Sequence, residues 1–238
     1  MTTREDLSAL SPDEIEAVEK LTLRWVFQAT LDFGMEAHEI FLKSPDDVKD
    51  IAEDITRELL DRLPGHNVPQ RIFGTVDYKK ARYIILPDQT IRQALFVDSK
   101  AEKSNATATI QMSQSSMLIR QQRGGREVEE AGSLPKISEY AGRHYLTTTA
   151  LLHFKYTDIR DTHHLQEVTL TAIPNGMLQD KYNPNATETI WLAGRNAPSR
   201  GEDFRVRLGF SRLREKCPWR VQKIAYDDAR GCQGAWHD

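Results

Sequence analysis

The sequence is poor in cysteine and has no long apolar run. Its two cysteines, Cys217 and Cys232, lack the spacing of a metal-ligand pair, so we expect free thiols in a reducing compartment. No apolar run approaches the roughly 20 residues that a membrane-spanning helix needs. The start, MTTREDLSAL, lacks the apolar core of a signal peptide. We therefore expect a cytoplasmic protein without a membrane segment.

A strong net charge is also missing. The chain has 32 lysines and arginines against 35 acidic residues, a formal net charge of -3, which argues against non-specific binding of polyanions. Any contact with nucleic acid must therefore be local. At 238 residues the chain is long enough for a substantial core, and nothing in its composition requires a second domain. We expect residues 1–238 to form a single domain.

Two extended segments joined by a turn at residues 87–90 are the central feature of the sequence. Pro and Asp between β-rich runs predict a β-hairpin. Folding it about the midpoint of residues 88 and 89 puts Asp77 opposite Lys100 and Lys79 opposite Asp98. Residues two apart on a strand share a face, so all four charged groups would lie on one side of the sheet. A register slip of one residue would undo this arrangement.

Two carboxylates and a lysine on one sheet face suit a Mg²⁺-dependent phosphodiesterase. Mg²⁺ is usually held by one or two carboxylates together with phosphate oxygens, so Asp77 and Asp98 would be its ligands, with the backbone carbonyl of Ser99 as a further one. Lys100 would offset charge on the phosphorus and help to position the attacking water. A second Asp-x-Lys triplet begins at Asp77, but Asp98-Ser99-Lys100 is preferred because an apolar strand leads into it.

Short segments along most of the chain share their order with those of one nuclease family: Ser11-Pro12-Asp13-Glu14 into Val18-Glu19-Lys20, Ala52-Glu53-Asp54-Ile55-Thr56, Val76-Asp77-Tyr78-Lys79, Val97-Asp98-Ser99-Lys100-Ala101, Tyr182-Asn183-Pro184, Arg200-Gly201-Glu202 and Cys217-Pro218-Trp219-Arg220. Together with the order of an aspartate, a hairpin and Asp-x-Lys, which is the PD-(D/E)xK nuclease pattern, they resemble the SfiI family of type II restriction endonucleases. Val76 stands where the general pattern has proline, although the aspartate carries the chemistry.

The resemblance implies an α/β, PD-(D/E)xK restriction-endonuclease-like fold, with a mixed central β-sheet flanked by helices. It also implies cleavage of double-stranded DNA at an interrupted, GC-rich palindrome, which leaves 3′ overhangs. We expect Mg²⁺ as cofactor, no nucleotide cofactor, and ends that carry a 5′-phosphate and a 3′-hydroxyl. The resemblance suggests a homotetramer that engages two DNA sites, and a homodimer would satisfy every argument from the residues.

Two helices are predicted before the hairpin. Ser11, Pro12 and Glu14 form a capping box that starts the first, which runs to Phe33-Gly34. The second follows Ser44-Pro45 and ends before Pro64-Gly65. It carries Glu53, for which two roles stay open. Glu53 is either an acid that approaches the metal site, as in similar nucleases, or an i,i+4 ion-pair partner of Arg57.

The stretch after the hairpin is less clear. Residues 106–117 are polar and rich in Thr, Ser and Gln, which fits a helix or a loop. The next segment has a Gly-Gly turn and reads as a basic loop, in which Arg123 and Arg126 either grip DNA phosphates or are solvated. Residues 145–156 and 168–172 are predicted strands, with His163-His164 as turn residues between them.

The segment from Arg195 to Lys223 is strongly basic, with nine lysines and arginines against three acids. Such a segment suits a DNA backbone, and Arg195 and Arg200 in its first part are candidate contacts. Apolar residues alternate with Arg205 and Arg207, whose side chains on a strand would lie about 7 Å apart, close to the rise of two base pairs. We expect this pair to read guanines, and the resemblance places a basic residue at Arg195 beside it. A solvated basic edge is the alternative.

Two competing functions remain. A structure-directed or repair nuclease with the same catalytic core would cut DNA without sequence preference. A non-catalytic DNA-binding module would use the Asp and Lys residues as structural charge pairs and would show no Mg²⁺-dependent activity.

Overall fold

Among the described residues, three helices precede the sheet strands and two short helices come late in the chain. The structure, a computed structural model, describes residues 6–44, 47–62, 70–72, 81–85, 90–103, 106–194, 205–227 and 230–238, with the backbone alone at 70–72 and 81–85. The helices are α1 (Pro12–Asp32), α2 (Gly34–Lys43), α3 (Val48–Asp61), α4 (Gln179–Tyr182) and α5 (Phe210–Lys216), with 3-10 turns η1 (Met112–Gln114), η2 (Gly176–Leu178) and η3 (Pro218–Arg220).

Caps fix where the first helices begin. The backbone N–H of Ser11 donates to Glu14 Oε2 at 2.7 Å, and the Glu14 N–H donates back to Ser11 Oγ at 3.3 Å, which confirms the predicted capping box of α1. The Asp47 side chain accepts from the Lys49 N–H at 2.9 Å and caps α3, the second predicted helix. None of the described helices is long and apolar enough to span a membrane.

Helix α2 was not predicted. It follows α1 after the single residue Phe33, so the apolar stripe changes direction at Gly34. A β-carbon at Gly34 would lie 2.2 Å from Cys232 Sγ, so only glycine allows this close approach of the C-terminal segment. Cys217 and Cys232 are free thiols, as predicted.

The strands form a large central sheet and two smaller sheets. They are β1 (Gln70–Ile72), β2 (Ala81–Ile85), β3 (Gln93–Glu102), β4 (Thr107–Gln111), β5 (Leu118–Arg123), β6 (Arg126–Ala131), β7 (Ile137–Tyr140), β8 (Arg143–Ile159), β9 (Thr162–Ile173), β10 (Trp191–Ala193), β11 (Arg205–Gly209), β12 (Val221–Asp227) and β13 (Gly231–Gly234). The central sheet has the order β1-β2-β3-β8-β9-β12-β13, with β7 on β8. β3 and β8 are parallel and the other pairs are antiparallel. The predicted mixed α/β architecture is therefore confirmed.

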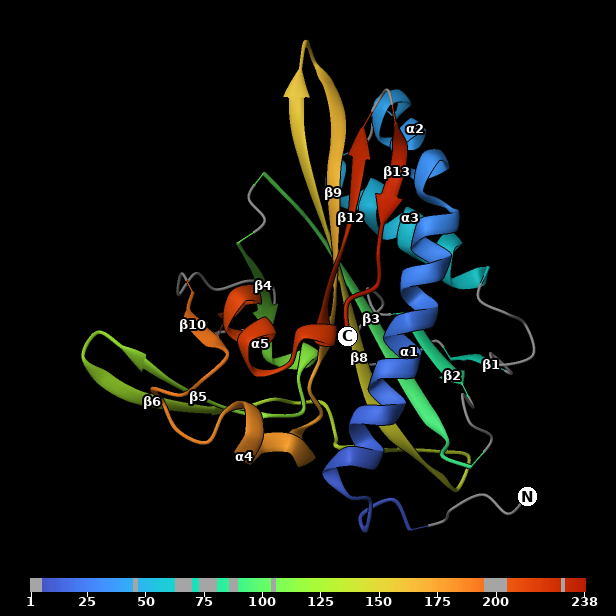
Figure 1. Ribbon diagram of the computed structural model, residues 1–238. Helices are drawn as coiled ribbons and strands as arrows, with labels where there is room; N and C mark the ends of the chain where they lie inside the picture. The colour runs from blue at the N-terminus through green and yellow to red at the C-terminus, as the bar shows by residue number, and fades with distance from the viewer. Residues whose placement is uncertain are drawn as a thin grey trace.

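Helices α1, α2 and α3 cover one face of the central sheet (Figure 1). On that face Thr22 of α1 donates to Gln93 Oε1 of β3 at 2.7 Å, and Phe41 of α2 stacks on Phe154 of β8 at 5.8 Å between ring centroids. On the opposite face His153 of β8 meets the ring of Phe210 on α5, with centroids 5.5 Å apart. The alternation of side chains along β3 and β8 thus separates a helical layer from the face that carries α5.

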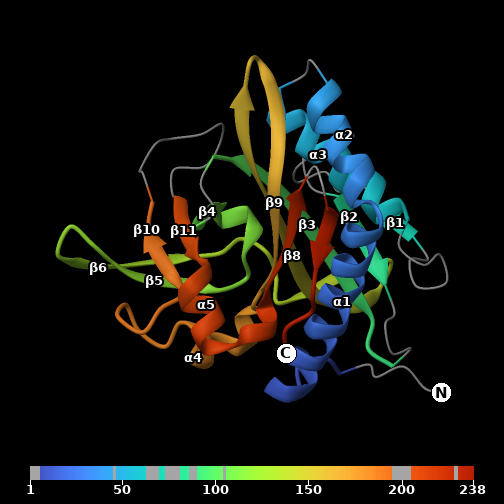
Figure 2. The ribbon, with the colours of Figure 1, turned by 45° about the horizontal axis from the view of Figure 1, so that its top comes forward.

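The small sheet, β10-β11-β4, and the β5–β6 hairpin lie on the other side of the central sheet from α1–α3 (Figures 1 and 2). The predicted strand at 204–210 is β11, where Val206 and Leu208 are fully buried and Arg207 is exposed. The segment at 106–117 is neither helix nor loop, because β4 occupies its first half and η1 follows. Its Thr and Ile residues favour a pleated strand.

The predicted hairpin is present in β2 and β3, but its register is one residue off. Ala81 pairs with Val97, whereas folding about the 88/89 midpoint pairs it with Phe96. Residues 86–89, which include most of the turn predicted at 87–90, lie outside the described residues, as does the segment around Asp77 and Lys79. That Asp77 shares a sheet face with Asp98 therefore remains a prediction. The strand register on which this prediction was based is wrong by one residue.

Two further expectations were wrong in detail. His163 and His164 are not turn residues, because they lie in β9 and the turn is made by Arg160 and Asp161, both with left-handed φ angles of 49° and 65°. The strand that the sequence predicts from Trp219 onward begins at Val221, as β12, because Trp219 belongs to η3. Predicted strands 145–156 and 168–172 lie within β8 and β9.

Candidate active site and DNA interface

Asp98 and Lys100 form a close ion pair on β3. Lys100 Nζ lies 2.8 Å from Asp98 Oδ2, and the two side chains are 23% and 11% exposed. They point to the same face because they are two apart on a strand. This is the face opposite α1, since Gln93 and Leu95, at odd positions of the same strand, contact α1. The sequence predicted that Asp98 and Lys100 share one face of a strand, and the structure confirms this.

Asp98 has an oxygen suited to hold a cation. Its Oδ2 is buried and lies 2.8 Å from Lys100 Nζ. An ionised carboxylate has two oxygens and about four lone-pair positions. Asp98 can therefore contact Lys100 and still offer a ligand to a divalent cation that prefers oxygen.

Two further polar groups lie on the same face, and neither was predicted. Glu102 continues the alternation of Asp98 and Lys100 along β3, and His153 of β8 is in register with Lys100. His153 is fully buried, with Nε2 3.4 Å from Glu102 Oε2. The position of Glu102, two residues after Lys100, could have indicated from the sequence that it shares their face. Nothing in the sequence indicated that β8 pairs with β3 and brings His153 to this face.

Ser99 and Glu53 lie on the helical side of β3. Ser99 is buried between the two site residues, with its side chain on the face opposite theirs. Glu53 is on α3, which packs on β3, and its carboxylate is 3.8 Å from Lys49 and 3.9 Å from Arg57. The structure therefore contains the i,i+4 pair that was the alternative role for Glu53. No described contact joins Glu53 to Asp98.

A polar face of the small sheet carries Arg205 and Arg207. β4 pairs with β11 so that Gln111 is opposite Arg205 and Thr109 is opposite Arg207. All four side chains are exposed or half-buried, while the other face, with Ile110, is buried. This face thus presents two arginines flanked by a hydroxyl and an amide. Arg195 and Arg200 lie outside the described residues.

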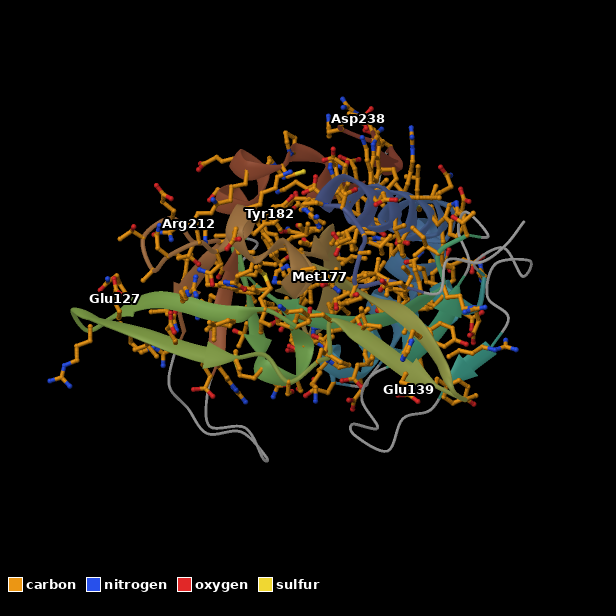
Figure 3. All side chains as sticks on the ribbon, turned by 90° about the horizontal axis from the view of Figure 1, so that it is seen from below. Glu127, Glu139, Met177, Tyr182, Arg212 and Asp238 are labelled. Atoms are coloured by element: carbon orange, nitrogen blue, oxygen red, sulfur yellow. The ribbon has the colours of Figure 1, made fainter. Side chains whose placement is uncertain are left out.

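The predicted basic loop is a β-hairpin. Gly124 and Gly125 have φ angles of 57° and 75°, as in a two-residue type I′ turn, and β5 and β6 flank them. Arg123, at the end of β5, donates from Nη2 to the backbone oxygen of Arg205 at 2.8 Å. Arg126 is exposed, and Glu127 beside it lies near the far end of the hairpin (Figure 3).

Several basic residues of the 195–223 segment have partners within the protein, and one of them is buried. Arg212 donates to the backbone oxygen of Thr189 at 3.2 Å, Lys216 donates to that of Lys181 at 3.1 Å, and Lys223 pairs with Glu167 at 2.8 Å. Arg220 is fully buried. Counting charges in the sequence does not separate a buried arginine such as Arg220 from arginines on the surface.

Arg220 belongs to a buried ionic network with α1. Its Nη2 lies 2.6 Å from Glu19 Oε2, its Nε donates to the Tyr182 hydroxyl at 2.6 Å, and its guanidinium stacks between the rings of Tyr182 and Trp219 at 4.5 and 4.4 Å. Burial raises the pKa of Tyr182, which keeps its hydroxyl protonated to donate to Glu16. These contacts join α1, near the start of the chain, to η3, near its end.

The chain is similar to known proteins in both sequence and structure. A family model described as Type II restriction enzyme SfiI matches residues 30–224. The Type II restriction enzyme SfiI of Streptomyces fimbriatus is 34% identical over 250 residues, which cover 98% of this chain and 93% of the relative.

Solved structures that are similar to this chain include the following two. One is the crystal structure of tetrameric restriction endonuclease SfiI bound to cognate DNA, with a TM-score of 0.86 and 33% identity, covering 99% of this chain and 94% of that one. The other is the restriction endonuclease BglI bound to its DNA recognition sequence, with a TM-score of 0.72 and 16% identity, covering 89% and 90%. The second similarity is one of fold alone.

Proposed function

Because the chain belongs to the SfiI family of type II restriction enzymes, we propose that it hydrolyses double-stranded DNA at an interrupted, GC-rich palindrome in a Mg²⁺-dependent reaction. The observation that carries this proposal is the Asp98–Lys100 pair on β3, in which the lysine ammonium lies beside the buried Asp98 Oδ2. A carboxylate and an ammonium 2.8 Å apart on a rigid strand suit phosphodiester hydrolysis.

The metal would be held by Asp98 and Asp77, with the backbone carbonyl of Ser99 as a further ligand. When bound, Mg²⁺ would polarise the phosphoryl group and make a coordinated water more acidic. The two carboxylates of the proposed set match the ligands that Mg²⁺ takes from protein chains.

Lys100 would act on the phosphate directly. Its ammonium group lies at the same strand face as Asp98, where it would offset negative charge on the phosphorus and help to position the attacking water. Glu102 and His153 would form the wall beside it. In-line attack by water on one phosphodiester in each subunit would leave a 5′-phosphate and a 3′-hydroxyl.

Glu53 would act from the helical layer. Its side chain is 21% exposed and lies between Lys49 and Arg57 at long distances of 3.8 and 3.9 Å, so these ion pairs hold it weakly. We infer that Glu53 could turn toward a metal-bound water at the end of β3 and support the site without being a direct ligand.

DNA recognition would use the arginine face of the small sheet. Arg205 and Arg207 project from β11 toward the same side, and arginine is the usual bidentate partner of guanine O6 and N7. Arg195 and Arg200 would contact DNA from the segment before β11, and Arg126 beside the hairpin turn would contact phosphate.

The assembly proposed is a homotetramer, as in the relative whose crystal structure is of tetrameric SfiI bound to cognate DNA. A symmetric oligomer presents identical sites to the two halves of a palindrome. The 238-residue chain would form a single domain in each subunit.

A digest of fully sequenced bacteriophage DNA with Mg²⁺ tests the proposal, with the fragment ends read by sequencing. Reproducible ends that share one interrupted palindrome and a 3′ overhang are expected. Ends without a shared motif would instead indicate a nuclease without sequence preference, and intact DNA at every metal and salt concentration would indicate a non-catalytic DNA-binding protein.

A further inference from the structure

The β5–β6 hairpin is joined to the strand that carries the candidate base-reading arginines. Arg123 is half-buried at the last position of β5, and its Nη2 donates to the backbone oxygen of Arg205 at 2.8 Å. Arg205 is the first residue of β11. The contact therefore holds β11 where it enters the small sheet.

Two arginines face each other across the turn of the hairpin. Arg123 is paired with Arg126 across the Gly124-Gly125 turn, and like charges that face one another on adjacent strands are destabilising. This pairing therefore does not explain an arginine at position 123. The hydrogen bond from Arg123 Nη2 is made outside the hairpin, to β11.

The other part of the hairpin is fixed independently. The side chain of Asn183, which is fully buried, accepts from the Arg120 N–H at 2.7 Å and donates to the Arg120 oxygen at 2.9 Å. Arg120 also pairs with Glu129 and donates to the Pro184 oxygen, at 2.8 and 2.7 Å. The hairpin is therefore a fixed support, from which Arg123 can hold a neighbouring strand in place.

Gly194 lies beside the same backbone oxygen. A β-carbon at Gly194 would lie 3.0 Å from the oxygen of Arg205, closer than such contacts ordinarily are. Glycine at this position leaves the oxygen accessible to the Arg123 guanidinium.

We propose that Arg123 is a positioning residue for sequence recognition: it holds the start of β11 so that Arg205 and Arg207 reach their base pairs in register, and it does not itself bind a DNA phosphate. This inference rests on the proposed function, because it assigns a role within the recognition of a specific site.

The test compares Arg123→Met with Arg126→Met, its neighbour across the turn. Both variants lose one positive charge and keep an unbranched, flexible apolar side chain. For each we would measure kcat/KM on a cognate duplex and on a duplex with one changed base pair, and the affinity for random duplex over a range of salt. Arg123→Met should lower the cognate kcat/KM at least tenfold and reduce the ratio between the two duplexes, with the salt dependence on random DNA unchanged. Arg126→Met should leave the ratio unchanged.

A direct phosphate contact would give a different result. Arg123→Met would then weaken cognate and random DNA equally, and the slope of log affinity against log salt would fall by about one, which would overturn the inference. An unchanged ratio would overturn it as well. If the wild-type enzyme itself cut without sequence preference, the proposed function would fail first, so the two failures are distinguishable.

Gly194→Ala supplies a second variant that changes no charge. The added methyl group would displace the Arg205 oxygen from the Arg123 guanidinium, so the ratio between cognate and altered duplexes should fall while the salt dependence stays that of the wild type. A thermal denaturation curve for each variant shows whether it is folded. Should Arg123→Met fail to fold, Gly194→Ala decides the question, and an unchanged ratio in it would overturn the inference.

Discussion

Arg220 and Glu19, 201 positions apart, form an ion pair in which both side chains are buried, with Nη2 2.6 Å from Oε2. The pair joins η3 to α1, and the second oxygen of Glu19 accepts from the Asn175 N–H at 2.8 Å. Burying two charges is expensive, and such a pair is favourable only when additional hydrogen bonds satisfy both groups. Here Tyr182 and Asn175 provide them.

Removing one partner should therefore be severe. Arg220→Met leaves the Glu19 carboxylate buried without its cation, and we expect a loss of about 3–5 kcal/mol in the free energy of unfolding. Urea denaturation followed by circular dichroism measures it. Arg214→Met, on the exposed surface of α5, is the matched control and should change the stability by less than about 0.5 kcal/mol. A similar small effect for Arg220→Met would mean that the pair contributes no net stability.

The stability should also depend on pH through Glu16. Burial alone would raise the pKa of this carboxyl, but hydrogen bonds from Lys181 and Tyr182 and the charge of Arg220 hold it below its usual range. A carboxyl whose pKa is lowered by folding stabilises the protein above its unfolded pKa, about 4.3 for glutamate. That stabilisation is lost as the pH falls through the folded pKa.

Glu16→Gln should therefore be less stable than wild type at pH 7, and the difference between the two should shrink as the pH falls from about 5 toward 3. Denaturation curves at successive pH values for both proteins check this expectation. A difference that remained constant down to the lowest pH would assign the acid dependence to other carboxyls.

The catalytic assignment rests on Asp98 and Lys100. Asp98→Ala and Lys100→Ala should each reduce Mg²⁺-dependent cleavage by at least about 10²-fold, because one removes a metal ligand and the other removes the charge beside the phosphate. Single-turnover cleavage of a cognate duplex measures the loss. Lys103→Ala, three residues further along the chain and paired with Asp158 at 2.7 Å, is the control and should retain activity. Near-wild-type cutting by Asp98→Ala would place the metal elsewhere.

Local signals predicted the parts of the fold that short-range chemistry determines. The capping box at Ser11 set the start of α1, and the apolar alternation at Val206 and Leu208 set the faces of β11. The Asp98–Lys100 pair was predicted for the same reason, since residues two apart on one strand share a face whatever the strand pairs with.

Features that depend on distant pairing could not be predicted. His153 joins the site only because β8 pairs in parallel with β3, some fifty residues earlier in the chain. The hairpin register was missed by one residue because turn geometry, rather than composition, sets it. Arg220 was counted as a surface charge because its partner Glu19 lies at the other end of the sequence.

Recognition supplies the last prediction. Arg207 is exposed on the polar face of β11, opposite Thr109 on β4, and would read a guanine. Arg207→Ala should cost about 1–3 kcal/mol at the cognate site and relax discrimination at one base-pair position, because a bidentate contact to one base is lost. Cleavage of a set of duplexes, each with a single substituted base pair, measures the effect. Arg205→Ala should relax a different position.

The control for this experiment is Arg214→Ala, which removes the same charge from the exposed side of α5. It should alter cleavage of all duplexes equally and slightly, since a distant charge acts through the general field of the protein. If Arg207→Ala weakened every duplex to the same extent, Arg207 would contact phosphate, and the base-reading role would pass to other residues of the small sheet, of which Thr109 and Gln111 share its face.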